Sequence, residues 1–236
     1  MDDAEYFALP CLSNSDLSSW ARGTAKDADD RNLFLGTIFH RMVLEPQKIT
    51  ERVQICDHRR NTKLWKAFLD EHPDADVLTT GEYDSLMGMK LSIEQHPEIG
   101  KVLEHARANR EQCEVVVIGD IDNVRFKCKI DQLGKSIIDW KSTGCLQAVD
   151  FAANVPAFDY DCQAYLYRRI LESATGEVKP FAFICVSKRR DAGNPCWIHP
   201  CDDATLASGE RMAMRMLGLW ARHNTTHPAF GAGIPF

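Results

Sequence analysis

The side chains of this sequence best suited to chemistry are two aspartates and a lysine close together in the chain. Asp131 ends an alternating apolar run that begins at Val124, and Asp139 and Lys141 flank Trp140 at the end of the next apolar run. Because side chains of a strand alternate between its faces, Asp139 and Lys141 point the same way. Two carboxylates and an ammonium group at strand ends would bind a hard divalent cation and an anionic substrate. The spacing therefore predicts metal-assisted cleavage of a phosphodiester.

A helix expected after these strands carries two further candidates, Gln163 and Tyr167. Residues four apart share one face of a helix, so both side chains could reach the same point. The alternative is that Tyr167 packs in the core while Gln163 is solvated.

A histidine and a glutamate complete the set. His40 lies next to the apolar stripe of an expected helix, and Gly36, one turn earlier, leaves room for a metal or a phosphate beside the imidazole. Glu114 opens the first expected strand and is either a ligand or an ordinary charge at a strand edge. The sequence has no zinc or iron–sulfur spacing, no phosphate-binding glycine-rich loop and no Gly-x-Ser-x-Gly turn.

The elements that must position these residues change in type after the first hundred or so positions. Before that point, periodicity and capping signals predict helices from residue 13, over 33–45, 61–71 and 80–95, and from residue 97. Strands are then expected over 114–118 and 124–130, joined as a hairpin by the turn-forming residues 119–123. A turn at Gly134 leads to a third strand over 135–140.

The remaining pattern predicts a helix over 159–173, strands over 181–186 and 197–198, a helix over 203–222 and an irregular tail from residue 227. This order predicts an α/β fold with a mixed central sheet flanked by helices. No repeat or linker divides the sequence. We therefore expect one domain over 1–236, with a mainly helical part to residue 110, a sheet core over 111–200 and a C-terminal helix and tail from 201.

The composition is that of an ordinary soluble globular protein, with 44% apolar and 26% charged residues. The longest apolar stretch, 181–186, is too short to cross a bilayer, and the acidic N-terminus does not resemble a secretory signal. Nine cysteines, several within apolar runs, indicate reduced buried thiols. These features predict a cytoplasmic protein.

The formal net charge of −6 argues against a non-specific DNA coat, but a local basic channel can coexist with an acidic exterior. Basic residues cluster at three places, and each cluster is either solvated surface charge or part of such a channel. The clusters are 58–60 with Lys63 and Lys66, Arg168-Arg169, and Lys188-Arg189-Arg190.

Several short segments occur in an informative order. They are Leu35-Gly36-Thr37-Ile38-Phe39-His40 with Val43-Leu44-Glu45-Pro46, then Lys129-Ile130-Asp131, Ile138-Asp139-Trp140-Lys141-Ser142-Thr143, and Gln163 with Tyr167. They resemble, in turn, the histidine helix, the active-site strands and the Gln-x-x-x-Tyr motif of RecE-type exonucleases (exonuclease VIII), in the RecB-like branch of the PD-(D/E)xK superfamily. Residues 12–17 resemble the start of that family's N-terminal helix. The sequence departs from the pattern in having Asp at position 139 rather than Glu, and in the short gap that follows Asp131.

This resemblance, over about residues 9–200, implies a restriction-endonuclease-like core of order α-β-β-β-α-β with an N-terminal helical extension. It implies a Mg²⁺-dependent exonuclease, with Mn²⁺ as a substitute, that digests the 5′-ended strand of double-stranded DNA. The 3′ single-stranded tails would serve homologous recombination. It also implies a homo-oligomeric ring around DNA ends, a single-strand annealing recombinase as partner, and a phage or prophage origin in a bacterial host.

Each candidate then has an expected role. Asp131, Asp139 and the backbone carbonyl of Trp140 would hold one Mg²⁺, while His40 and Glu114 would help to hold a second ion.

Lys141 would orient the attacking water and offset charge on the phosphate, and Gln163 and Tyr167 would contact the substrate.

Two alternatives to this function stay open. One is a structure-specific or restriction-type endonuclease, which would cut closed circular DNA, and the other is a non-catalytic DNA-binding recombination protein.

Overall fold

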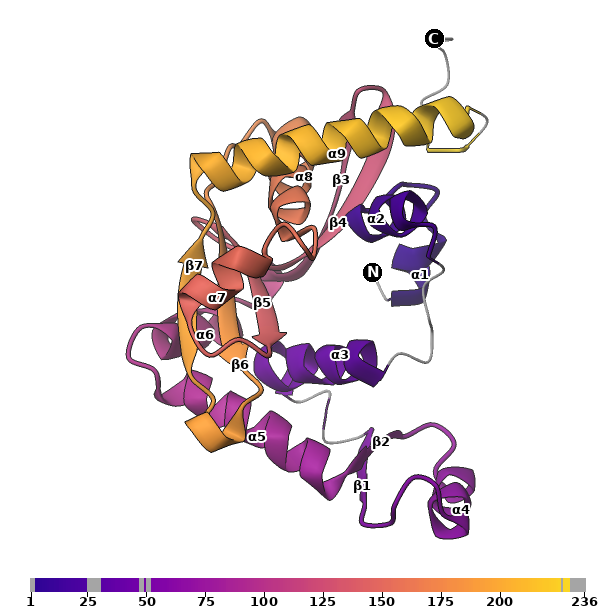
Figure 1. Cartoon of the computed structure of the whole chain (residues 1–236), viewed down its shortest axis with the longest axis vertical. Coiled ribbons are helices and arrows are strands. Elements are labelled where there is room, and N and C mark those ends of the chain that lie inside the picture. Colours follow the sequence, from indigo (N-terminus) through magenta and orange to yellow (C-terminus); the bar gives the residue numbers. More distant parts are fainter. Residues whose placement is uncertain (1–2, 25–30, 47–48, 50–51, 226, 230–236) are drawn as a thin grey trace.

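The computed structural model describes residues 3–24, 31–46, 49, 52–225 and 227–229. Its centre is a five-stranded sheet of order β3-β4-β5-β6-β7 (Figure 1). The strands are β3 (Cys113–Ile121), β4 (Val124–Leu133), β5 (Ile137–Thr143), β6 (Phe181–Ser187) and β7 (Cys196–Pro200). All neighbours are antiparallel except β5 and β6, which are parallel. The sheet is mixed, as the sequence predicts.

The order of the strands follows from their connections. Asp122 and Asn123 form the two-residue turn between β3 and β4, and both have positive φ, which these residue types tolerate. The parallel pair β5–β6 needs a crossover, because a tight turn can join only antiparallel strands. That crossover contains α7 (Ala148–Asn154) and α8 (Tyr160–Thr175).

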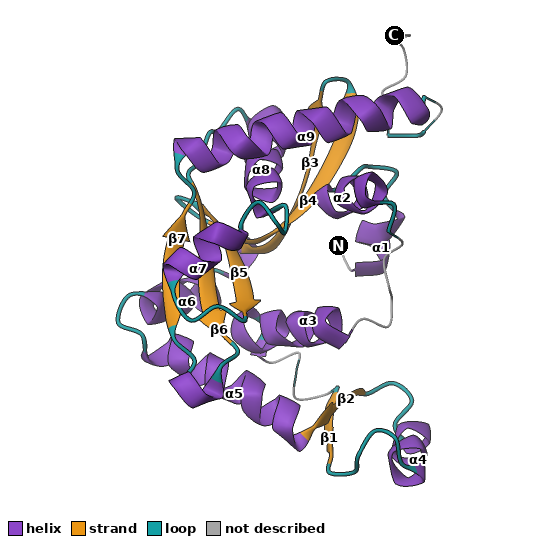
Figure 2. Ribbon diagram, viewed as in Figure 1, coloured by secondary structure: helices purple, strands orange, loops and turns teal. Residues whose placement is uncertain are grey.

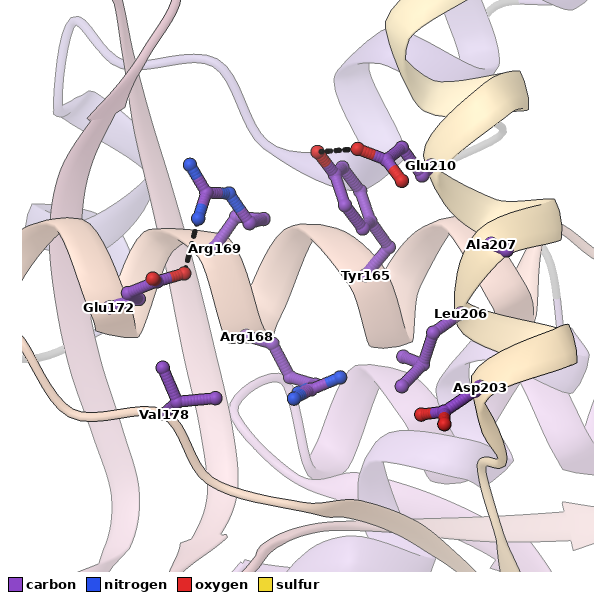
Figure 3. A pocket seen from close by; sticks show the side chains of 9 residues that line it. All are labelled: Tyr165, Arg168, Arg169, Glu172, Val178, Asp203, Leu206, Ala207 and Glu210. Atoms are coloured by element: carbon purple, nitrogen blue, oxygen red, sulfur yellow. Dashed lines mark hydrogen bonds and ion pairs between the residues drawn. The ribbon is translucent and has the colours of Figure 1, made fainter.

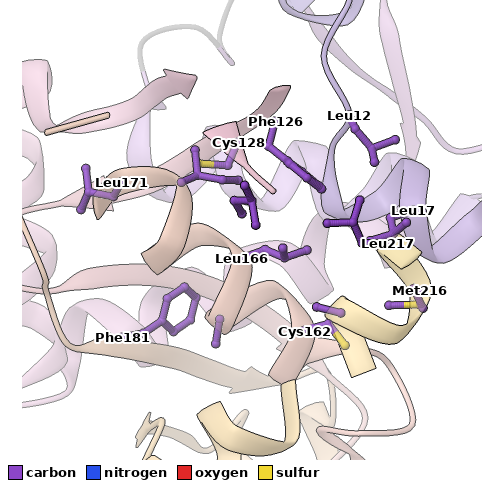
Figure 4. Close-up of a cluster of buried hydrophobic side chains, with 14 of the residues drawn as sticks. Leu12, Leu17, Phe126, Cys128, Cys162, Leu166, Leu171, Phe181, Met216 and Leu217 are labelled. Carbon is purple, nitrogen blue, oxygen red and sulfur yellow. The ribbon is translucent and has the colours of Figure 1, made fainter. Parts of the chain in front are cut away.

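One face of the sheet is covered by α2 (Asn14–Arg22), α8 and α9 (Asp203–His223), as Figure 2 shows. Alternate residues of β4, including Phe126, Cys128 and Ile130, are buried in this core with Leu166 of α8 and Leu217 of α9 (Figure 4). The alternation that predicts β4 as a strand therefore also fixes which of its faces is apolar.

The other face of the sheet is covered by α3 (Arg31–Leu44), α5 (Thr80–Gln95) and α6 (Ile99–Ala108). Trp140 and Ile184 of the sheet are fully buried among Phe39, Ile93 and Leu103 of these helices. This second core holds α3, and with it His40, against the sheet.

A short N-terminal segment covers the part of the β4 edge that β5 leaves unpaired. Leu12 forms a parallel bridge with Phe126 next to α1 (Asp3–Ala8). The buried Lys127 ammonium donates to the carbonyl oxygens of Tyr6 and Leu9 at 3.0 and 3.1 Å. Lys127 therefore anchors this segment to the sheet.

A small lobe projects beyond the start of α5 (Figure 1). It consists of the parallel strands β1 (Val53–Cys56) and β2 (Asp76–Thr79) with α4 (Lys63–Glu71) between them. Its core is small, with Cys56, Trp65 and Val77 buried together.

The sequence predicts most of these elements within a few residues of their bounds, including the Ser13–Asp16 capping box that begins α2. It misses α1, α7, β1 and β2, which are short and gain their stability from docking rather than from periodicity. Residues 230–236 of the expected irregular tail lie outside the described residues.

All nine cysteines are free, as expected. No helix among the described residues is both long and apolar enough to span a membrane.

Gly209 allows α8 and α9 to pack closely. A Cβ atom at this position would lie 2.0 Å from the carbonyl oxygen of Asp161, so we expect Gly209→Ala to destabilise the fold by about 3 kcal/mol. Gly218, on the same helix, has open space where a Cβ atom would lie, and Gly218→Ala should be neutral or stabilising by up to about 1 kcal/mol. Urea denaturation of both variants tests this, and equal stabilities would contradict it.

We expect Glu82 to make the free energy of unfolding depend on pH in the acidic range. Partial burial would raise the pKa of Glu82, but hydrogen bonds from Arg31 and from the Thr79 backbone outweigh this and lower the pKa from 4.5 to about 2. The ionised carboxylate therefore stabilises the fold fully above about pH 4.5, and this contribution is lost as the pH falls towards 2.

We expect Glu82→Gln to lower the free energy of unfolding by about 2 kcal/mol at pH 7 and by less than half of that at pH 3. Urea denaturation at the two pH values measures the difference. Glu98→Gln, at an exposed position, is the control. A Glu82→Gln deficit that is the same at both pH values would contradict the assignment.

Candidate active site

The candidate site lies where β4 and β5 separate. Backbone pairing of the two strands ends at Gln132–Ile138, so Asp131 and Asp139 are the next residues on diverging strands. The Trp140 N–H donates instead to Oδ2 of Asp131 at 2.8 Å. The Asp131 carboxylate thus replaces a sheet acceptor where the ladder stops, and it lies beside the backbone that carries Asp139. The predicted approach of the two aspartates is present.

Asp139 has two fixed partners. Its Oδ2 forms an ion pair with the Lys141 ammonium at 2.7 Å, and its Oδ1 accepts a hydrogen bond from the buried Gln163 amide. Asp139 and Lys141 therefore share a face, as the strand periodicity predicts. Gln163 is not solvated, and it orients Asp139 from the first turns of α8.

His40, Glu114 and Asp131 form a second group of contacts. One ligand atom from each of the three lies within 4.8 Å of the others, and Nδ1 of His40 is 3.4 Å from Oδ2 of Asp131. Glu114 also pairs with the Lys129 ammonium at 2.7 Å. The structure thus brings together His40 and Glu114, which are far apart in the sequence, around Asp131.

The charged groups of this site shift one another's pKa values. Burial disfavours the imidazolium, but the Asp131 carboxylate outweighs burial and raises the pKa of His40 to about 9. Burial opposes ionisation of Asp131, but His40 and Lys141 hold its pKa below the ordinary value. Burial raises the pKa of Asp139, and burial together with the charge of Asp131 raises that of Glu114. Carboxylates that repel one another in this way provide a favourable place for a cation.

Glu114 reaches the site through unusual backbone geometry. It lies opposite Asp131 in the register set by the pairs Cys113–Gln132 and Val115–Ile130, and its φ is +53°. A left-handed conformation costs a residue other than glycine about 1 kcal/mol or more, so surrounding contacts must maintain it. Here it accompanies a carboxylate turned towards Asp131 and Lys129.

Two tyrosines of α8 face the same region. Tyr167 packs edge-to-face on Phe181, with ring centroids 6.3 Å apart, and burial raises its pKa well above the ordinary value. Tyr167 is partly buried and packs against the first core, and its contact with substrate stays a prediction. Tyr160, one turn before Gln163, has the Lys141 ammonium 4.8 Å from its ring centroid. This cation–π contact holds Lys141 in place.

Sequence reasoning misses Tyr160 and Lys129 as members of the site. Lys129 could have been found, because it precedes Asp131 by two positions on the same strand and must share its face. Tyr160 could have been found by the spacing that identifies Gln163. The Trp140 indole is buried away from these groups in the second core, and the role of its backbone carbonyl stays a prediction.

The residues present fit a hard divalent cation. The carboxylate oxygens of Glu114 and Asp131 suit Mg²⁺ or Mn²⁺, and the His40 imidazole is a softer ligand that favours Mn²⁺ over Mg²⁺. The three donor atoms are close enough to share an ion. The nearby Lys141 would bind an anionic group next to it.

Comparison with known proteins agrees with this geometry. Residues 14–202 match the family described as PDDEXK-like domain of unknown function (DUF3799). The chain belongs to this family. A PD-(D/E)xK protein of this kind is an enzyme of the nuclease type, and the superfamily depends on divalent metal ions. In this PDDEXK-like chain the letters of the motif can be matched to Asp131 and to Asp139-Trp140-Lys141.

One solved structure shows the same fold. The "Putative exonuclease" from Eubacterium rectale superposes with a TM-score of 0.67 at 16% identity, covering 95% of this PDDEXK-like chain and 87% of the other. The alkaline exonuclease (LHK-Exo) from Laribacter hongkongensis covers 93% of both chains at 17% identity, but its TM-score of 0.31 carries no argument. No curated protein matches the sequence.

Proposed function

We propose that this PDDEXK-like protein is a Mg²⁺-dependent exonuclease that digests the 5′-ended strand of double-stranded DNA and leaves 3′ single-stranded tails. The observation that carries the proposal is the convergence of Asp131, Asp139 and Lys141 where β4 and β5 separate, with His40 and Glu114 beside them. Acidic ligands next to one half-buried ammonium suit hydrolysis of a phosphodiester. The resemblance to RecE-type exonucleases supports the choice of DNA ends as substrate.

Each side chain has a role in this reaction. Asp131, Asp139, Glu114 and His40 would hold the metal, with the Trp140 carbonyl as a further ligand. A bound divalent cation, or two, would supply Lewis acidity towards the phosphate and lower the pKa of a coordinated water.

Lys141 lies against Asp139 and binds the phosphate oxygen on which negative charge grows during attack by water. Gln163 keeps Asp139 in one orientation by its hydrogen bond. Tyr160 limits the movement of the lysine, and Tyr167 would support the bound strand near the scissile phosphate.

The deciding experiment compares two DNA substrates. A linear duplex labelled at either the 5′ or the 3′ end and a covalently closed circle are incubated with the protein and MgCl₂, with EDTA as control. We expect loss of the 5′-ended strand of the linear duplex only. Nicking or cutting of the circle would show an endonuclease, and binding without any digestion would show a non-catalytic recombination protein.

The biological setting is also a proposal. The resemblance to RecE-type exonucleases supports a homo-oligomeric ring on DNA ends, with a single-strand annealing recombinase as partner. It also supports action in the cytoplasm of a bacterial host, with a phage or prophage as the origin of the gene. Light scattering coupled to size exclusion would measure the oligomer, and a monomer at micromolar concentration would contradict the ring.

A further inference from the structure

The three basic clusters of the sequence differ in how their charges are used. In the second cluster, Arg169 pairs with Glu172, and Arg168 donates a hydrogen bond to the Lys179 carbonyl oxygen at 2.8 Å. Both arginines line a cavity of about 240 Å³ between α8 and α9, and acidic residues line it as well (Figure 3). In the third cluster, Arg189 pairs with Asp191 and Arg190 lies 3.7 Å from Asp84. Most of the positive charge in these two clusters is therefore balanced locally.

The cluster on the small lobe is different. Arg60 pairs with Glu82, but Arg59, Lys63 and Lys66 are exposed and have no ion-pair partner within 4.0 Å among the described residues. His58 is exposed beside them. We call Arg59, Lys63 and Lys66 the lobe patch. Its three positive charges lie between positions 59 and 66 of a chain whose formal net charge is −6.

The positions of the charged residues in α4 lower the stability of that helix. Its first turn has no acidic residue and begins with Lys63, while its last turn has no basic residue and ends with Asp70-Glu71. Both ends oppose the helix dipole, and each unfavourable charge costs a few tenths of a kcal/mol. Proteins break such local rules mainly at functional or strained sites, so this arrangement favours a functional use of the α4 charges.

The lobe is held firmly on the helix that carries His40. Arg31, at the start of α3, pairs with Glu82 at 2.6 Å and donates to the Val77 carbonyl oxygen at 3.0 Å. Arg41, the neighbour of His40, pairs with Asp76 at 3.1 Å. These contacts join β2, the strand that follows α4 in the lobe, and the start of α5 to both ends of α3.

We propose that the lobe patch binds the phosphate backbone of the duplex ahead of the strand being cut. The proposal rests on the proposed function, since it assigns the surface that holds the duplex part of the same substrate. Exposed lysines and arginines neutralise phosphates and release counterions, which gives sequence-independent affinity. Such binding suits an enzyme that must accept any sequence.

The test is the salt dependence of duplex binding. A fluorescent 30-bp duplex is titrated with protein in EDTA, where metal-dependent digestion stops, at several KCl concentrations from 50 to 200 mM. Each phosphate contact contributes about 0.9 to the slope of log Kd against log salt. We expect Arg59→Gln/Lys63→Gln/Lys66→Gln to lower this slope by about 2.7 and to weaken binding at least about tenfold at 100 mM KCl.

The matched control is Arg169→Gln/Arg189→Gln/Arg190→Gln, which makes the same change of three charges at side chains that are paired or close to a carboxylate. Its slope should stay that of the unmodified protein. Equal slopes for all three proteins, or an equal fall in both variants, would overturn the proposal. If the triple variant does not fold, Lys63→Gln/Lys66→Gln should lower the slope by about 1.8. Failure of the proposed function is separate, because it is seen as absence of digestion by the unmodified protein.

Discussion

Lys141→Ala should reduce hydrolysis of linear duplex by about 10²–10³-fold or more while the protein stays folded. The ammonium is the positive charge held within 2.7 Å of Asp139, so its loss removes the group that balances charge on the phosphate in the transition state. Single-turnover digestion of end-labelled duplex with MgCl₂ measures the rate. Lys135→Ala, at an exposed position just before β5, is the matched control and should act at the normal rate.

Stability must be separated from chemistry in this experiment. Without Lys141 the buried Asp139 carboxylate keeps Gln163 as a partner but loses its cation, and we expect a destabilisation of about 1–3 kcal/mol. Lys141→Arg retains the positive charge on a larger, planar group, and it should restore much of the stability without restoring the rate. A Lys141→Ala protein that digests duplex at the normal rate would refute the assignment of the active site.

Asp131→Asn should remove metal binding and lower activity by at least about 10²–10³-fold. The substitution keeps an oxygen that can accept the Trp140 N–H bond but removes the negative charge that lies between His40 and Glu114. Isothermal titration with MgCl₂ or MnCl₂ should show binding heat for the unmodified protein and little or none for the variant. Asp120→Asn, exposed at the far end of the same hairpin, should bind metal normally.

A second substitution at position 131 separates the loss of the metal ligand from the loss of the hydrogen-bond acceptor. Asp131→Ala also leaves the buried Trp140 N–H without its acceptor, which costs about 1–3 kcal/mol. We therefore expect Asp131→Ala, but not Asp131→Asn, to lower the free energy of unfolding by that amount. Unchanged metal binding in Asp131→Asn would exclude this residue as a ligand.

Local patterns predict the part of the site that lies on the sheet. Alternation along β4 and β5 places Asp131, Asp139 and Lys141 correctly, because period two and a short turn leave few other arrangements. The same reasoning could have placed Glu114. Its register partner across the Asp122-Asn123 turn is Asp131, since both lie equally far from the turn.

The contributions of the helices could not be derived in this way. His40 reaches Asp131 only because Phe39 and its neighbours on α3 pack against the sheet, and nothing in the spacing of either segment specifies that contact. The lobe is a similar case. Its strands have four residues each, and β2 is held by Arg31 and Arg41 of α3 rather than by a pattern of its own.

The hydrogen bond from the Trp140 N–H to Asp131 limits how this protein can evolve. Asp131 is at once a ligand candidate and a part of the scaffold, because it satisfies a main-chain donor at the point where two strands part. Lys141 bonds no main-chain group of the described residues and stabilises the fold through its ion pair with the Asp139 carboxylate, a partner that can be lost together with it. A lineage that gave up the chemistry could lose the lysine early, but it would be under pressure to keep Asp or Asn at position 131. Degenerate copies of this gene should therefore retain that acceptor long after the ammonium group has gone.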